Sequence, residues 1–209
     1  MRLGIFGGTF DPPHLGHLLI ASDAVAALQL DSLVFIPTAQ QPLKLGRAAA
    51  PAEARLEMVR RLVVGLPSLS VDAIEVDRAG LSYTVDTLAE YARRYPDAER
   101  FFLLGSDAVR TFPSWREPAR IASLARLVVL RRSPELADEA TELEGDSMEQ
   151  SLAKVQAITG SASAPITLRT RRIDVSSTEV RDRVRNGLPL RGFVTDAVAR
   201  FIEASGLYR

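Results

Sequence analysis

The two histidines of the chain lie three positions apart, in a stretch rich in glycine and proline. The stretch is Gly7-Gly8-Thr9-Phe10-Asp11-Pro12-Pro13-His14-Leu15-Gly16-His17, and it directly follows the apolar run Leu3 to Phe6. If the chain turns here from a strand into a helix, His14 and His17 share one helix face beside free backbone N–H groups at the positive helix end. Such an arrangement is suited to bind an anion, and phosphate is the expected ligand.

The usual nucleotide-binding and metal-binding motifs do not match this stretch. It contains neither the G-x-G-x-x-G pattern of dinucleotide sites nor the G-x-x-x-x-G-K-[ST] pattern of a P-loop. A metal site is disfavoured because two histidines without any cysteine offer few soft ligands. The alternative is a Gly-Pro turn that carries two surface histidines, but the glycines, which permit close approach of the backbone to an anion, favour the functional interpretation.

A second anion site is predicted near the C-terminal end of the sequence. Ser176-Ser177-Thr178-Glu179 is typical of a helix N-terminus, with hydroxyls that can cap and an acid in the first turn. Arg181 follows one helical turn later, within a run of six arginines: Arg169, Arg171, Arg172, Arg181, Arg183 and Arg185. A plain helix cap, an ordinary charged helix face and a nucleic-acid contact are the alternatives, and the neutral total charge favours a local phosphate site.

Strands and helices alternate along the predicted chain. Strands are predicted at 2–6, 32–37, 70–76, 101–104 and 127–130, and helices at 18–28, 52–64, 84–95 and 195–205. This alternation indicates an α/β fold, a single-domain Rossmann-like doubly wound parallel sheet with helices on both faces. Ligands bind beyond the carboxyl ends of such strands, so we expect the loop after Phe6 and the loop Gly105-Ser106-Asp107 to share one site.

Composition narrows the class of protein. The 209 residues fit one domain, 1–209, and the net charge of +0, from 26 basic and 26 acidic residues, gives no general reason to expect nucleic acid or a membrane as partner. The absence of cysteine excludes disulfides and thiolate catalysis and suits a cytoplasmic location. No apolar run approaches the length of a membrane span. The oligomeric state stays open.

Two regions differ from the rest in composition. Seven acidic residues and no basic one lie between Glu135 and Glu149, which predicts a solvated insertion at about 135–150; an acidic partner-binding surface is the alternative. The part from about 176 to 209 is expected to be helical.

The stretch 7–17 resembles the signature of the nucleotidyltransferase superfamily with the (T/H)xGH motif. Within it, the chain resembles the bacterial nicotinate-nucleotide adenylyltransferases, because further family-like stretches follow in order over nearly the whole length. These are Ile36-Pro37 to Lys44, Ser82-Tyr83-Thr84, Gly105-Ser106-Asp107, Trp115, Arg132, and Ser176-Ser177-Thr178 to Arg181.

The resemblance implies a reaction. The phosphate of nicotinate mononucleotide would attack the α-phosphorus of ATP, giving nicotinate adenine dinucleotide and pyrophosphate, with Mg²⁺ accompanying ATP through phosphate oxygens and water. A phosphate with a second pKa of about 6 is already largely dianionic near neutrality, so no general base is required. Catalysis then consists of positioning and charge neutralisation.

The resemblance also implies residue roles. His14 and His17 would stabilise charge on the transferred phosphate and pyrophosphate, Thr9 would orient the phosphates, and Lys44 and Arg181 would hold the leaving group. The implied ATP-binding set is Gly7, Gly8, Thr9, Phe10, His14, His17, Gly105, Asp107, Ser176, Ser177, Thr178 and Arg181. The implied mononucleotide-binding set is Lys44, Tyr83, Thr84, Asp107, Trp115 and Arg132, with no protein-held metal. Capping by Ser82-Tyr83-Thr84, core packing of Trp115 and use of Arg131 in place of Arg132 are the alternatives.

Three other functions compete with this one. A phosphopantetheine-type adenylyltransferase often carries threonine where His14 stands, and a cytidylyltransferase is disfavoured by the Ser176 to Arg181 stretch. A nucleotide-sensing regulator without turnover is disfavoured by the intact histidine pair. The chain departs from the family at Leu43, where a histidine is common, and at Pro118, where a second tryptophan is common. The degree of discrimination against nicotinamide mononucleotide leaves no side-chain signature.

Overall fold

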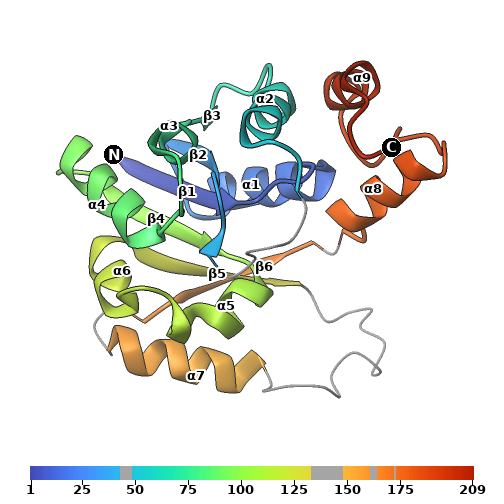
Figure 1. Cartoon of the computed structure of the whole chain (residues 1–209). Helices are drawn as coiled ribbons and strands as arrows, with labels where there is room; N and C mark the ends of the chain where they lie inside the picture. The colour runs from blue at the N-terminus through green and yellow to red at the C-terminus, as the bar shows by residue number, and fades with distance from the viewer. Residues whose placement is uncertain (43–48, 133–147, 161–163, 172) are drawn as a thin grey trace. The chain divides into compact units, whose positions relative to one another are not determined.

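The computed structural model describes residues 1–42, 49–132, 148–160, 164–171 and 173–209 (Figure 1). Six strands in this part of the chain are hydrogen-bonded in the order β3-β2-β1-β4-β5-β6. Their bounds are β1 Arg2–Gly8, β2 Ser32–Pro37, β3 Leu69–Val71, β4 Glu99–Leu104, β5 Arg126–Arg132 and β6 Ile166–Thr170. The strand pairs β1–β4, β2–β3, β4–β5 and β5–β6 are all parallel, as the alternation of strands and helices predicted.

Helices cover both faces of the sheet. Consecutive residues are buried in β2, from Leu33 to Pro37, and in β4, from Phe101 to Leu104. Successive side chains of a strand point to opposite faces, so an unbroken buried run requires cover on both sides. The doubly wound α/β fold is therefore confirmed.

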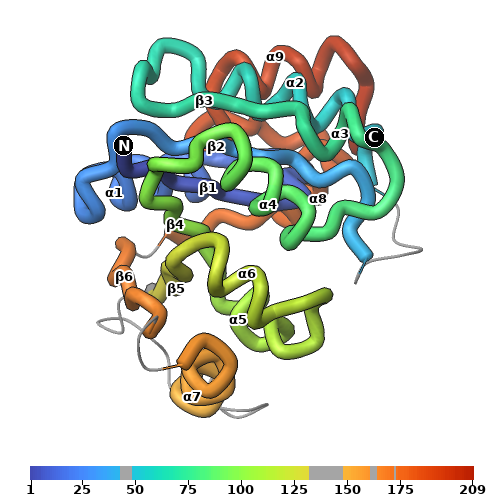
Figure 2. The backbone as a smooth tube through the Cα atoms, turned by 90° about the vertical axis from the view of Figure 1, so that its left-hand side faces the viewer, coloured from blue at the N-terminus to red at the C-terminus, as the bar shows by residue number. Residues whose placement is uncertain are grey.

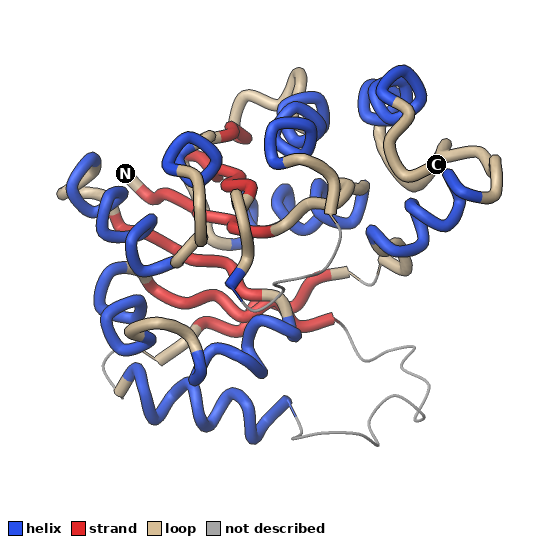
Figure 3. Tube along the Cα trace, viewed as in Figure 1, coloured by secondary structure: helices blue, strands red, loops and turns tan. Residues whose placement is uncertain are grey.

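The chain divides into two compact units, each of which contains both helices and strands, coloured blue and red in Figure 3. The first unit consists of Met1–Ile5 and Tyr83–Arg172, and the second unit of Phe6–Ser82 and Ile173–Arg209. Strand β1 thus begins in the first unit and ends in the second. The expected single domain stays a prediction.

The second unit contains five of the described helices, which are α1 Leu15–Ala27, α2 Ala52–Leu62, α3 Ile74–Arg78, α8 Ser177–Arg185 and α9 Asp196–Ser205. Helix α2 contacts β2 and α9 and buries Leu56, Val59 and Leu62, which lie on one face at helical spacing. The predicted helices at 52–64 and 195–205 are confirmed within two residues, and α1 begins three residues before the predicted 18–28.

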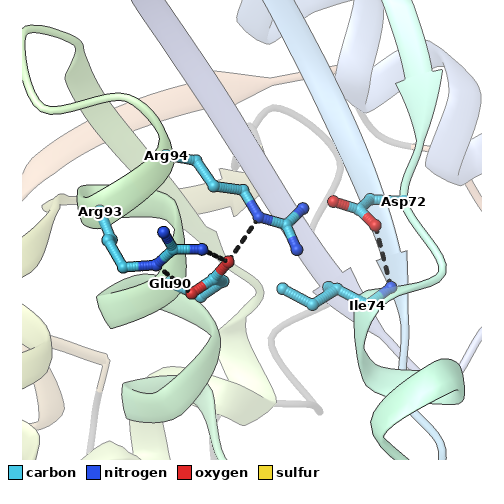
Figure 4. Close-up of polar contacts among 5 residues, drawn as sticks. All are labelled: Asp72, Ile74, Glu90, Arg93 and Arg94. Atoms are coloured by element: carbon cyan, nitrogen blue, oxygen red, sulfur yellow. Dashed lines mark hydrogen bonds and ion pairs between the residues drawn. The ribbon is translucent and has the colours of Figure 1, made fainter.

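The predicted strand 70–76 is wrong beyond Val71. The Asp72 carboxylate accepts a hydrogen bond from the Ile74 N–H at 2.9 Å (Figure 4), and this contact starts the short helix α3 at Ile74. The apolar residues Ile74 and Val76 therefore belong to a helical turn and not to the strand.

The first unit carries helices that the sequence did not reveal. Helix α4, Thr84–Arg94, matches the prediction, and Glu90 on it pairs with both Arg93 and Arg94 at 2.7 Å (Figure 4). Helices α5 Ser106–Thr111, α6 Pro118–Leu124 and α7 Met148–Thr159, the 3-10 turn η2 Phe112–Ser114 and strand β6 were not predicted. Helix α7 contacts α5 and α6 (Figure 2).

The predicted acidic insertion lies mostly outside the described residues. Its last member, Glu149, belongs to the first turn of α7. No helix in the described ranges is long and apolar enough to cross a membrane.

Candidate active site

The histidine stretch forms the predicted turn from strand to helix. Strand β1 ends at Gly8, and His14 is the N-cap of α1 with an extended backbone. The His14 N–H donates to Nδ1 of His17 at 3.2 Å, and the two imidazole centroids lie 3.8 Å apart. The two rings are therefore neighbours on the first turn of α1, as predicted.

The environment of His17 fixes its protonation. The ring packs edge-on against Phe10, with centroids 5.0 Å apart, and burial together with the adjacent His14 lowers the pKa of His17 well below its ordinary value. Because Nδ1 accepts the His14 N–H, the proton of the neutral ring resides on Nε2. Nε2–H is thus the hydrogen-bond donor that the ring can present to an anion.

Two glycines make room for the rings around the turn. Phe10 adopts the left-handed backbone conformation, with φ of 48°, and a Cβ added at Gly8 would lie 2.8 Å from its ring. A Cβ added at Gly16 would lie 2.9 Å from Cε1 and Nδ1 of His14. Only glycine at position 16 leaves the His14 ring in its place.

The start of helix α8 is hydrogen-bonded to the same turn. Ser177 Oγ donates to the Pro12 carbonyl at 2.8 Å, and Arg181 Nη1 donates to the Asp11 carbonyl at 2.6 Å. The structure therefore brings the two predicted anion sites together within the second unit.

The residues beside Ser177 on α8 have separate partners. Ser176 caps α8 through its hydroxyl, which accepts the Glu179 N–H at 3.1 Å, and Thr178 Oγ1 accepts from Arg181 Nη2 at 3.1 Å. Both the capping role and the anion site foreseen for this stretch are compatible with these contacts.

Three residues without a role in the sequence-based prediction hold the turn by hydrogen bonds: Asp11 within the turn, and Arg55 and Tyr208 outside it. The buried Arg55 guanidinium donates to the carbonyls of Thr9, Ala39 and Ala50 at 2.7, 2.9 and 2.9 Å, and burial lowers the pKa of Arg55. The buried Asp11 carboxylate accepts from the Tyr208 hydroxyl at 2.7 Å and the Ala50 N–H at 3.1 Å.

The chain is similar in sequence to known proteins over most of its length. A cytidylyltransferase-like family model matches residues 5–183. A Gemmatimonas aurantiaca protein named "Probable nicotinate-nucleotide adenylyltransferase" is 48% identical over 209 residues, covering 100% of this chain and 93% of the relative. A Thermus thermophilus protein of the same name is 41% identical over 209 residues, covering 100% of both chains.

The chain belongs to the nicotinate-nucleotide adenylyltransferase family. The same fold occurs in a Plasmodium falciparum nicotinic acid mononucleotide adenylyltransferase complexed with NaAD, with a TM-score of 0.72 at 17% identity over 99% of this chain and 97% of that one. The structure of that enzyme complexed with APC gives a TM-score of 0.70 at the same identity, over 99% of this chain and 96% of that one. At this level of identity the likeness shows the fold alone.

The residues expected at the pyridine ring of the adenylyltransferase substrate lie in the first unit. Trp115 follows η2, is half-buried against Phe112 with ring centroids 5.6 Å apart, and donates from Nε1 to Thr111 Oγ1 at 3.1 Å. Tyr83 is the N-cap of α4, Thr84 is the first residue of that helix, and the Arg116 guanidinium lies 4.9 Å from the Tyr83 ring centroid. Their roles toward the ring stay predictions.

The preceding Ser82 has a structural partner. It lies in the second unit, and its hydroxyl accepts the Ala39 N–H at 2.9 Å. This contact joins Ser82 to the segment after β2 and gives the buried hydroxyl a hydrogen-bond partner.

The remaining predicted residues are placed as follows. Gly105 is the N-cap of α5, and Asp107 is exposed in the first turn of that helix. Arg132 is the last residue of β5, in register with Thr170 of β6. Lys44 and Leu43 lie outside the described residues. Pro118 is the first residue of α6. A backbone N–H at this position has no partner within the helix, so proline, which lacks the N–H, is tolerated there.

A shared site for the loops at Thr9 and Gly105 stays a prediction. Among the described residues, no group of three or more histidine, cysteine, aspartate or glutamate side chains could hold a metal ion. The Asp11 carboxylate accepts hydrogen bonds from the Tyr208 hydroxyl and from the Ala50 N–H.

Proposed function

We propose that this chain transfers AMP from ATP to nicotinate mononucleotide, forming nicotinate adenine dinucleotide and releasing pyrophosphate. The observation that carries the proposal is the histidine pair on the first turn of α1, joined to the start of α8 by Ser177 and Arg181. Imidazole donors, a guanidinium and two helix N-termini are groups that bind and neutralise phosphates. Membership of the adenylyltransferase family supports the choice of substrates.

The reaction breaks one bond and forms one at the α-phosphorus of ATP. An oxygen of the mononucleotide phosphate bonds to this phosphorus, and the bond to the β-phosphate oxygen breaks as pyrophosphate leaves. The attacking phosphate is already anionic, so the protein needs no base. Its contribution is to align the two phosphates and to neutralise the charge that collects on the leaving group.

The second unit supplies the groups for this charge neutralisation. His17 would donate from Nε2–H, which the neutral ring carries because Nδ1 accepts the His14 N–H. Arg181 uses Nη1 and Nη2 in contacts with Asp11 and Thr178 and retains further N–H groups for phosphate oxygens. Thr9, whose hydroxyl donates to Gln41 Oε1 at 2.9 Å, would orient the reacting phosphates together with the Gly7-Gly8 backbone.

We assign recognition of the mononucleotide to residues of the first unit and to Lys44. Trp115 would stack on the pyridine ring, Tyr83 and Thr84 would contact its substituent, Asp107 would bind a ribose hydroxyl and Arg132 the phosphate. The aromatic and polar character of these side chains suits a flat, charged ligand. The assignment follows the resemblance to the family.

Magnesium would enter with ATP as part of the substrate. The described residues offer no cluster of ligands for a resident ion, so phosphate oxygens and water would hold it. The ion would offset negative charge on the phosphates, which is the same task that His17 and Arg181 perform from the protein side.

The cysteine-free composition suits a reducing cytoplasm, and no nucleic-acid partner is proposed.

Pyrophosphate release tests the proposal. Purified protein with ATP and Mg²⁺ is offered nicotinate mononucleotide, nicotinamide mononucleotide and phosphopantetheine in parallel at equal concentration. Strong preference for the nicotinate form is expected. Activity with phosphopantetheine alone would contradict the proposal and assign the chain to coenzyme A synthesis. No pyrophosphate release with any of the three substrates would favour a nucleotide-sensing regulator.

A further inference from the structure

A polar cluster joins Asp11, a residue of the Thr9–His14 turn, to Arg55, Arg181 and Tyr208 outside the turn. The Asp11 carboxylate is buried, and its Oδ1 accepts both the Tyr208 hydroxyl and the Ala50 N–H. Arg181 donates to the Asp11 carbonyl, and Arg55 donates to the Thr9 carbonyl. All four residues belong to the second unit.

Tyr208 differs from the two arginines of the cluster because its hydroxyl donates to the Asp11 carboxylate, whereas each arginine donates to a backbone carbonyl of the turn. Tyr208 follows the end of α9 and has a left-handed backbone, with φ of 67°. Burial and the adjacent Asp11 raise the pKa of the phenol, so it stays a neutral donor. A buried carboxylate needs its donors, because each lost hydrogen bond to a buried charge is costly.

We propose that Tyr208 is a positioning residue for adenylyl transfer, which acts by holding the Asp11 carboxylate and thereby the turn that carries Thr9 and His14. The hydroxyl joins the segment after α9 to a turn 197 positions earlier in the sequence. Without it, Asp11 keeps the Ala50 N–H but loses its phenol donor. The turn then samples positions in which His14 and Thr9 are misaligned, and misalignment lowers the rate more than it lowers binding.

The test compares Tyr208→Phe with Tyr95→Phe. Both substitutions delete one hydroxyl and keep the ring, and Tyr95 is 42% exposed and belongs to the first unit. Tyr208→Phe is expected to lower kcat about tenfold and to change KM for ATP by less than about twofold. Tyr95→Phe is expected to leave both constants unchanged.

A double-substitution cycle tests the route through Asp11. If Tyr208 acts through the carboxylate, Tyr208→Phe is expected to add little to the loss already caused by Asp11→Asn. Full additivity of the two losses would overturn this route. An unchanged kcat in Tyr208→Phe would overturn the proposal itself, as would an equal loss in Tyr95→Phe.

Amide hydrogen exchange provides a readout without substrate. The kinetic test rests on the proposed function, whereas the exchange rate of the Ala50 amide, which donates to Asp11, does not. Tyr208→Phe is expected to speed this exchange about tenfold at an unchanged global unfolding midpoint. If the wild-type protein shows no transfer at all, the proposed function fails, and the exchange rate alone then decides whether Tyr208 holds the turn: an unchanged rate overturns this hold, and a faster rate supports it.

Discussion

The backbone N–H of His14 donates to the ring of His17 at 3.2 Å, so one imidazole both caps helix α1 and presents its opposite nitrogen as a donor. This double use makes a simple alanine substitution ambiguous, because it removes the cap together with the imidazole chemistry. A glutamine at the same N3 position can still accept the N-cap N–H in a capping box. The pair of variants therefore separates the two roles.

We predict that His17→Gln and His17→Ala both lower kcat by about a hundredfold or more, since alanine lacks the imidazole Nε2–H and glutamine replaces it with an amide N–H that is not held at the Nε2 position. His17→Ala is expected to be less stable than His17→Gln by about 1 kcal/mol, the usual effect of a lost cap. Steady-state pyrophosphate release and urea unfolding measure the two effects. Turnover of His17→Gln within a few-fold of the wild-type protein would exclude a role for the imidazole in transfer.

The lowered pKa of His17 predicts a stability that depends on pH. The unfolded chain binds a proton at this site near pH 6.5, whereas the folded protein binds it only at lower pH. The contribution is therefore fully present above about pH 6.5 and is lost as the pH falls toward the folded pKa, with a slope of at most about 1.4 kcal/mol per pH unit.

Urea unfolding at about pH 7.5, 6.5 and 5.5 checks this pH dependence, with His17→Gln as the reference that lacks the titrating group. As the pH falls, the unfolding free energy of the wild-type protein should decrease relative to that of His17→Gln. A difference that is constant over the three pH values would show that the folded pKa of His17 is not lowered.

Gly16→Ala has two opposing effects: it raises helix propensity, and it displaces the His14 ring. Alanine in place of an interior helical glycine normally stabilises a helix by about 1 kcal/mol. Here the new Cβ would lie 2.9 Å from the His14 ring, so the ring must move away. We predict a kcat lowered at least about tenfold in a protein that remains folded by circular dichroism. Wild-type turnover in Gly16→Ala would show that the position of His14 is not critical.

Arg55 is predicted to be a stability residue. Arg55→Ala removes three charge-assisted donors and leaves three carbonyls without them, at a cost of about 3 kcal/mol or more. Arg60 on the same helix is the control, since its side chain is 56% exposed and Arg60→Ala should change stability by less than about 0.5 kcal/mol. Equal unfolding midpoints for the two variants in urea would contradict the role of Arg55.

Trp115→Ala is predicted to weaken nicotinate mononucleotide more than ATP. Loss of the indole removes the stacking surface that we assign to the pyridine ring, whereas the ATP phosphates are assigned to the second unit. The ratio of the two KM values, compared with that of Trp115→Phe, measures the effect. Equal weakening of both substrates, or of neither, would remove Trp115 from the pyridine site.

The parts of the site that sequence analysis predicted are those with local signals. The turn at 7–17 and the start of α8 were predictable because glycines, a cap and an apolar stripe occur within a few positions of each other. Helices α5 and α6 were missed because six or seven residues are too few to show a helical period. Strand β6 was missed because only Leu168 and Thr170 of its five residues are buried, so it has no apolar run.

Arg55, Asp11 and Tyr208 had no local signal of their importance. An arginine inside an amphipathic helix suggests an exposed face, and Arg55 is buried only because the fold brings three backbone carbonyls to it. Tyr208 meets Asp11 across 197 positions of sequence. Contacts of this range depend on the complete fold, and a single sequence does not encode them as a pattern.

The hydrogen bonds of the histidine turn also limit how far the motif can be transplanted. A designer who moved only residues 7–17 onto another strand and helix would carry over the glycines and both imidazoles. The recipient would lack the donors that Arg55, Ser177 and Arg181 supply to the carbonyls of residues 9, 12 and 11. The smallest portable unit is therefore the turn together with α2 and the start of α8, and a match to the eleven-residue pattern alone does not identify a working phosphate site.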